Sequence, residues 1–204
     1  MTGATRPYHH GDLRRALLAA AEAILDRAGP SGLTLRAVAR EAGVSHAAPA
    51  HHFGDLVGLL SELAAIGYTR FGERLAAAAA AAPPAAVLQA MGFAYVGFAG
   101  AHPGLFQVMF RSERLDMNRP ALREAADAAW AELGRAVADR STLTRTTLAD
   151  TARRIAPWAL AHGLAFLLID GRLASQLATL PTRERNMDAL VRATLGAMTL
   201  QPAE

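Results

Sequence analysis

Helical periodicity runs through almost the whole chain. Apolar residues recur every three or four positions over most of the 204 residues, and almost no stretch alternates as a β-strand does. Leu17, Ala21 and Ile24, for example, share one stripe of a first helix that ends before Pro30. We therefore predict an all-α fold of about nine helices, the last of which starts at Pro181.

The composition excludes several classes of protein. A hydrophobic fraction of 52% with 19% charged residues is typical of a globular chain rather than a disordered one. The absence of cysteine excludes disulfide scaffolds, thiolate metal sites and cysteine nucleophiles. All 21 basic residues are arginine, but the net charge is only +3, so charge alone does not indicate nucleic-acid binding.

The sequence lacks the motifs of common enzymes. It has no Gly-x-Ser-x-Gly, no Gly-x-Gly-x-x-Gly and no phosphate loop. Five of the seven histidines precede residue 53, but none forms a spaced metal-ligand set, because His51 and His52 are adjacent and point apart on a helix. We predict no enzymatic activity, no cofactor and no metal.

One long stretch carries no charge. From Leu75 to Phe110 there is no Arg, Asp or Glu, but the stretch is rich in Ala and Gly and is interrupted by Pro83 and Pro84. Such a composition favours buried helices of a soluble bundle over a membrane span. The N-terminus has no apolar core of a secretory signal. We predict a cytoplasmic protein without membrane contact.

A helix-turn-helix pattern lies between residues 34 and 53. Thr34 is suited to cap a short helix that ends at Gly43, where a left-handed backbone is favoured. A short turn brings the two helices that it joins close together, so the first helix needs a small residue, which Ala39 provides. The corner between the helices would be filled by Val38, Ala42 and Val44. In DNA-binding proteins the second helix of this motif enters the major groove.

These residues resemble the tetracycline-repressor (TetR) family of transcriptional regulators. The resemblance covers GLTLRAVAREAGVS, then His52-Phe53, then Leu59-Leu60. A second stretch, Trp158-Ala-Leu-Ala-His162-Gly163, is similar to the Trp-His-Gly motif of one class of C-terminal domains in that family. The resemblance implies a DNA-binding head over residues 1–53, with a flexible arm at 1–10, and a ligand-binding and dimerisation domain over 54–204.

The resemblance also implies the residues that contact double-stranded DNA. We expect Ser45 to cap the recognition helix and Pro49, inside that helix, to remove one helical hydrogen bond, because its nitrogen cannot donate to Ser45. The predicted contact residues are Thr34, Arg36, Ser45, His46, Ala47, Ala48, His51 and His52. The small side chains among them are equally consistent with residues that are merely tolerated at the groove. Two positions depart from the family, because Ala50 replaces a usual Tyr and Leu56 a usual Lys. Both usual side chains contact phosphates, so weaker DNA binding is expected.

The C-terminal domain is predicted to hold a small, largely apolar effector and to form a homodimer. The predicted pocket residues are Phe93, Phe98, Phe106, Met109, Phe110, Trp130, Trp158 and His162, with Gln89, Tyr95, Gln107 and His162 available to orient the ligand. Most of the large apolar residues could equally be core, and His162 could be a core histidine beside a Gly163 that permits close packing. The predicted dimer residues are Leu164, Leu168, Met187, Val191, Thr194 and Met198.

Two functions are therefore open. The first is a ligand-responsive repressor that binds a pseudo-palindromic operator as a dimer and is released by its effector. The alternative is a small-molecule-binding helical dimer whose DNA-binding head is weakened or lost, which Ala50 and Leu56 suggest.

Overall fold

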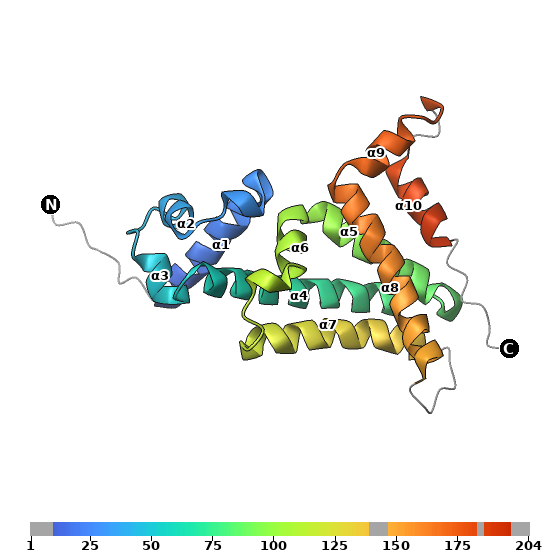
Figure 1. The fold of residues 1–204 in the computed structure, drawn as a ribbon, viewed down its shortest axis with the longest axis horizontal. Helices are drawn as coiled ribbons and strands as arrows, with labels where there is room; N and C mark the ends of the chain where they lie inside the picture. Colours follow the sequence, from blue (N-terminus) through green and yellow to red (C-terminus); the bar gives the residue numbers. More distant parts are fainter. Residues whose placement is uncertain (1–9, 139–146, 183–185, 197–204) are drawn as a thin grey trace. The chain divides into compact units, whose positions relative to one another are not determined.

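The computed structural model describes residues 10–138, 147–182 and 186–196, which form α-helices and no β-strand (Figure 1). This confirms the predicted all-α class. The helices are α1 (His10–Ala28), α2 (Leu35–Glu41), α3 (Ala48–Phe53), α4 (Leu56–Ala81), α5 (Val87–Ala101), α6 (Pro103–Met109), α7 (Pro120–Ala138), α8 (Leu148–Ile169), α9 (Arg172–Leu177) and α10 (Met187–Gly196). Single 3-10 turns lie at Pro30–Gly32, Pro84–Ala86 and Ser112–Arg114.

The end of the chain differs from the prediction in two ways. Helix α9 was not predicted: Gly171, at φ 72°, ends α8, and Leu173 and Leu177 then bury one side of a short new helix. The last helix begins at Met187 rather than at Pro181. Its start is fixed by Asn186, whose Oδ1 accepts a hydrogen bond from Ala189 N at 2.9 Å.

The described residues form two compact units. The first unit holds the chain up to Gly67 together with Gly104–Arg123, and the second unit holds Tyr68–Pro103 and the chain from Glu124 onward. The first unit therefore extends beyond the head predicted to end at residue 53, because it includes the start of α4 and all of α6. The predicted division at 53 is a division by sequence motif, whereas these units follow contacts.

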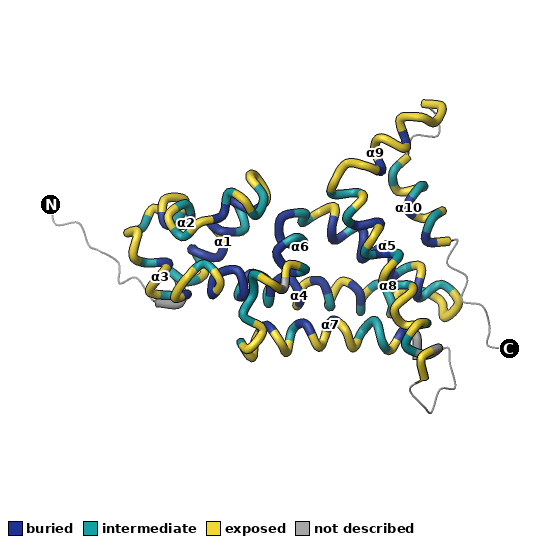
Figure 2. Tube along the Cα trace, viewed as in Figure 1, coloured by how far each residue is buried: buried dark blue, intermediate teal, exposed yellow. Residues whose placement is uncertain are grey.

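The first unit is held together by a close approach of two helices. A Cβ at Gly104, near the start of α6, would lie 2.5 Å from the Leu25 carbonyl oxygen of α1, so only glycine fits there. The core of the unit includes Leu17, Ala21, Ile24, Leu25, Val38, Phe53, Leu59, Leu63, Leu105, Phe106 and Met109. Figure 2 shows buried segments of α1, α4 and α6 in dark blue.

The second unit is built on the packing of α5 along α8. The segment Pro84–Ala101 is long and apolar enough to cross a membrane by length and composition alone. Helix α5, however, contributes buried Met91, Tyr95 and Phe98 to the core of the unit. Phe71 of α4 packs edge-on against Tyr95, with ring centroids 4.8 Å apart. Helix α5 is thus partly buried core, whereas residues 76–86 of the uncharged stretch are exposed or half-buried.

Candidate DNA-binding and ligand-binding sites

The predicted corner of the helix-turn-helix is present in the first unit. Thr34 Oγ1 accepts a hydrogen bond from Ala37 N at 3.1 Å and so caps α2. Gly43 follows α2 at φ 68°, and Val44 N donates to Ala39 O at 3.0 Å to close the turn. Val38 and Ala39 are fully buried. Sequence patterning predicted the cap at Thr34, the left-handed Gly43 and the places of Val38 and Ala39 in the corner, but not the hydrogen bond from Val44 to Ala39.

A surface ion pair joins the ends of α1 and α2. Arg27 donates from its two guanidinium nitrogens to the two carboxylate oxygens of Glu41, at 3.3 and 2.8 Å. The hydrogen bond and charge of Arg27 lower the pKa of Glu41, and those of Glu41 raise the pKa of Arg27. This pair is a contact between α1 and α2, but it contributes little stability because both residues are exposed to solvent.

The recognition helix is shorter than predicted. Helix α3 begins at Ala48, and the residues from Ser45 to Ala47 form the turn that precedes it. Its N-cap is Ala47, so the expected cap at Ser45 was wrong. Pro49 lies in the first turn of α3, where a missing N–H leaves no helical bond unmade. The predicted loss of a helical hydrogen bond at Pro49 was therefore also wrong.

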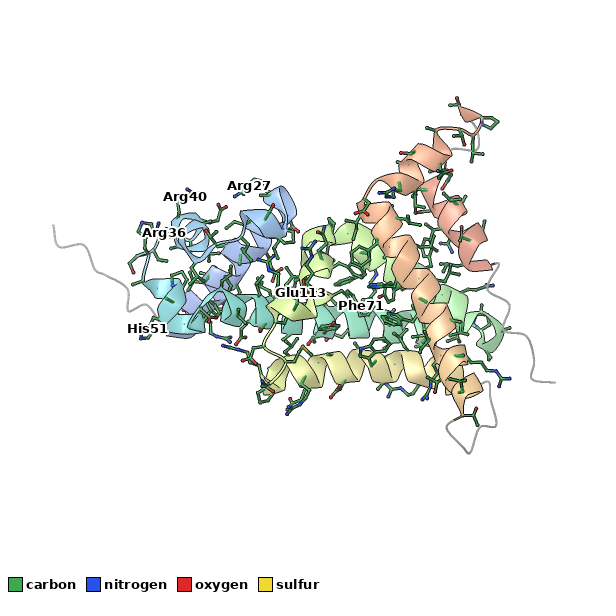
Figure 3. All side chains as sticks on the ribbon, viewed as in Figure 1. Arg27, Arg36, Arg40, His51, Phe71 and Glu113 are labelled. Atoms are coloured by element: carbon green, nitrogen blue, oxygen red, sulfur yellow. The ribbon has the colours of Figure 1, made fainter. Side chains whose placement is uncertain are left out.

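The predicted DNA-contact residues lie on the surface around α2 and α3. Those that are exposed are Thr34, Arg36, Ser45, His46, Ala47 and His51, and those that are half-buried are Ala48 and His52. Figure 3 shows Arg36 on α2 and His51 on α3. Of the two departures from the family pattern, Ala50 is exposed and Leu56 is half-buried at the start of α4. The contacts with DNA stay predictions.

Sequence reasoning did not find the residues that join α3 to α4. A Cβ at Gly58 would lie 1.9 Å from the Phe53 carbonyl oxygen, so this junction requires glycine. Asp55 Oδ1 accepts from Gly58 N at 2.8 Å and caps α4, and Arg119 donates to Phe53 O at 3.4 Å. Arg119 is distant in sequence, which is why no local pattern pointed to it.

A cavity lies in the second unit between α5, α7 and α8. Its enclosed part is small, about 20 Å³, and the space counted out through its open mouth into solvent is about 370 Å³. The lining residues are Leu88, Met91, Gly92, Tyr95, Leu133, Arg154, Pro157, Trp158 and Ala161. Apart from Arg154, all of these are apolar or aromatic, which is typical of a small-molecule site.

Three aromatic side chains share hydrogen bonds at this cavity. Trp158 Nε1 donates to Tyr95 Oη at 3.2 Å, and Tyr95 Oη lies 2.8 Å from His162 Nδ1. Burial raises the pKa of Tyr95 and lowers the pKa of His162, so at neutral pH the phenol keeps its proton and the imidazole is uncharged. The arrangement that satisfies all three groups has Tyr95 donating to an unprotonated Nδ1.

The structure brings only part of the predicted pocket to this cavity. Trp158 lines it, His162 adjoins it through Tyr95, and the Trp130 ring lies 4.7 Å from that of Trp158, although Trp130 is 43% exposed. Phe93 lies under the guanidinium of Arg192 at 3.7 Å, and Phe98 packs on Phe71. The residues that belong to the first unit instead are Phe106, Met109 and Phe110.

The predicted dimer residues are divided between interior and surface. Leu164 and Val191 are buried within the second unit, at 5% and 3% exposure. Leu168, Met187 and Thr194 are half-buried, and Met198 lies outside the described residues. Among the described residues, a Cβ at Gly163 would meet nothing within 4 Å, so Gly163 packs against none of the described helices.

Within the described ranges no group of three or more His, Asp or Glu could hold a metal ion. The lining residues that sequence reasoning missed are Leu88, Met91, Gly92, Leu133, Arg154, Pro157 and Ala161. Arg154 could have been found from its spacing, because it lies one helical turn before Trp158 and so shares its face of α8.

Comparison with known proteins settles the family. Residues 17–63 match the model of bacterial regulatory proteins of the tetR family, and residues 88–194 match the tetracycline repressor-like C-terminal domain. The chain belongs to the TetR family. It is a DNA-binding transcriptional regulator, and the family is not enzymatic. Its assignment to the Trp-His-Gly class stays a prediction.

Several solved structures are similar to this TetR-family chain over nearly its whole length. A protein of unknown function from a Rhodococcus species is 34% identical, with a TM-score of 0.73, and the match covers 97% of this chain and 100% of that one. PfmR, a TetR-family regulator from Thermus thermophilus, is 18% identical with a TM-score of 0.58, over 88% and 94% of the two chains. LfrR from Mycobacterium smegmatis, solved with proflavine, is 20% identical with a TM-score of 0.57, over 93% and 97%. No curated protein matches the chain.

Proposed function

We propose that this TetR-family regulator is a cytoplasmic repressor that binds a pseudo-palindromic operator as a homodimer and is released by a small, largely apolar effector. The observation that carries the proposal is the cavity of the second unit, which opens beside the Tyr95–Trp158–His162 cluster in the same chain as a helix-turn-helix. The similar regulator LfrR was solved with the small molecule proflavine. An effector that favours one of two arrangements by about 1–3 kcal/mol would change operator affinity about 5- to 150-fold.

The head has exposed groups suited to DNA. Arg36 and His51 can contact phosphates, and the turn from Ser45 to Ala47 with the start of α3 can approach base edges. Selection from random duplex DNA by the purified chain, at low and at physiological salt, tests this. Enrichment of an inverted repeat would support a dimeric reader.

A second candidate function is favoured by Ala50 and Leu56, which replace two phosphate contacts usual in the family. In that case the protein is a ligand-binding dimer with a weakened head. Absence of any enriched sequence at both salt concentrations, together with retained ligand binding, would favour this candidate over the repressor.

The outward face of α8 supports the proposed dimer. Ile155 and Leu167 are 49% and 40% exposed, and Ala159 and Gly163 lie between them on the same face. Small residues in the middle of an apolar face let two helices approach closely. We propose that this face, rather than buried Leu164, meets the second subunit.

Light scattering after gel filtration tests the dimer. Gly163→Arg should convert a dimer into a species near the 21.5 kDa chain mass, because a charged side chain would enter the interface. Gly134→Arg is the matched control, since it also lies in a helix of the second unit with nothing within 4 Å of its Cβ. A wild-type chain that runs as a monomer would contradict the proposal outright.

A further inference from the structure

We infer that the cavity of the second unit selects an apolar molecule that carries one anionic group, a carboxylate in the simplest case, and that Arg154 is its counter-ion. The inference rests on the proposed function, in which this cavity holds the effector. It adds the chemical class of that effector and the residue that recognises it.

The cavity walls separate an apolar interior from a charged rim. Met91, Tyr95 and Ala161 are almost fully buried, at 2%, 1% and 3% exposure. Leu133, Pro157 and Trp158 are half-buried, and Arg154 is exposed to solvent. Arg154 is also the sole charged residue among those that line the cavity. A ligand therefore meets apolar surface inside and a single positive charge at the mouth.

The charge of Arg154 is available for a ligand. In the part of the chain that the structure describes, Arg154 forms no ion pair with a carboxylate. Glu132, which precedes the lining residue Leu133 on α7, is engaged by Arg135. Helix α5, which forms the opposite wall, carries no acidic residue. A bound carboxylate would thus pair with a guanidinium that forms no ion pair among the described residues.

The polar groups of the interior favour the same orientation. Tyr95 Oη accepts from Trp158 Nε1 and donates to His162 Nδ1, so these groups already satisfy one another. An anion placed deep in the cavity would have to break this set, whereas an apolar body would leave it intact. The ligand is therefore expected to enter apolar end first and to leave its anionic group at Arg154. A cationic ligand would be repelled at the mouth.

Ligand binding in the cavity can be followed by the tryptophan emission of the chain itself. Its only two tryptophans are Trp158, which lines the cavity, and Trp130, whose ring lies 4.7 Å from that of Trp158. Tryptophan emission of the full chain is titrated with octanoate, octan-1-ol and octylamine, which share one apolar chain and differ in the charge of the head group. We expect octanoate to bind about tenfold more tightly than octan-1-ol, and octylamine to bind most weakly.

Substitution of Arg154 tests whether this residue causes the preference for octanoate. Arg154→Gln should remove the advantage of octanoate and leave the affinity for octan-1-ol unchanged, whereas Arg154→Lys should keep part of the advantage. Arg153→Gln is the matched control, because it removes the same charge from the neighbouring residue, which does not line the cavity. This control should keep the full preference, and the preference should shrink as salt is raised.

The outcomes separate this inference from the proposed function. If octan-1-ol binds as tightly as octanoate, or if Arg154→Gln keeps the preference, the anion selectivity is wrong and the effector cavity stands. If none of the three probes alters tryptophan emission, both the selectivity and the proposed effector site are overturned.

Discussion

The helix-turn-helix and the α5–α8 region differ in the range of the contacts that define them. In the first, Thr34 bonds to Ala37 three residues away, and the turn is closed between Ala39 and Val44. In the second, Tyr95 meets Trp158 and His162 across 63 and 67 residues of sequence. Contacts between residues close in the sequence produce recognisable sequence patterns, whereas contacts between distant residues do not. The difference shows which parts of the protein can be predicted before the fold is known.

The largest effect is expected at Gly104, where the first unit also depends on a contact between residues far apart in the sequence. This prediction tests whether the first unit is as locally determined as the comparison implies. Gly104→Ala places a Cβ 2.5 Å from the Leu25 carbonyl oxygen, so α6 must move away from α1. We expect a loss of about 3 kcal/mol in the free energy of unfolding, measured by urea denaturation. Gly134→Ala is the control, with nothing within 4 Å, and should gain up to about 1 kcal/mol from helix propensity. Equal stability of the two variants would refute the close approach.

The next prediction tests the distant contacts of the second unit. Tyr95→Phe keeps the ring against Phe71 but removes the partner of Trp158 Nε1 and of His162 Nδ1. We expect a loss of about 2 kcal/mol in the free energy of unfolding, because two half-buried polar groups each lose a hydrogen bond. A change in Trp158 emission should accompany it. A variant as stable as the wild type would show that these hydrogen bonds contribute no net stability.

A smaller effect is expected where the head departs from its family. The double change Ala50→Tyr with Leu56→Lys supplies the two usual phosphate contacts and should tighten DNA binding about fivefold at low salt. The slope of log K against log salt should steepen by about 0.9 for the one charge added. Ala131→Lys adds the same charge at an exposed position on α7 and serves as the control. No tightening would mean that the phosphate anchors are misplaced.

The smallest expected effect is a dependence of stability on pH. Burial lowers the pKa of His162 in the folded chain, whereas the unfolded chain titrates near 6.5. Between these values the unfolded state binds more protons, so stability falls as pH drops below about 6.5 and levels off below the folded pKa. His162→Asn keeps an acceptor for Tyr95 and cannot titrate, so its melting temperature should vary less between pH 7 and pH 5. Parallel curves for the two proteins would argue against this assignment.

Sequence reasoning went furthest where one helix or one turn sufficed. The all-α class, the cap at Thr34 and the left-handed Gly43 followed from spacing and propensity alone. The cap predicted at Ser45 was wrong. Serine is a residue type that often caps helices, but α3 starts three residues later, at Ala48. Sequence reasoning also placed Phe106 in the pocket, because an apolar residue looks the same whether it lines a cavity or fills a core.

The sequence by itself determined the all-α class, most of the helices and the corner of the DNA-binding motif. These depend on interactions within a few residues, namely caps, turns and the period of the apolar face. Only the tertiary structure decided that Arg154 lies at the mouth of the cavity, that Gly104 must be glycine, and that Gly163 faces outward. Each of these depends on which distant helix lies opposite the residue, and that is set by packing of the whole core rather than by any local pattern.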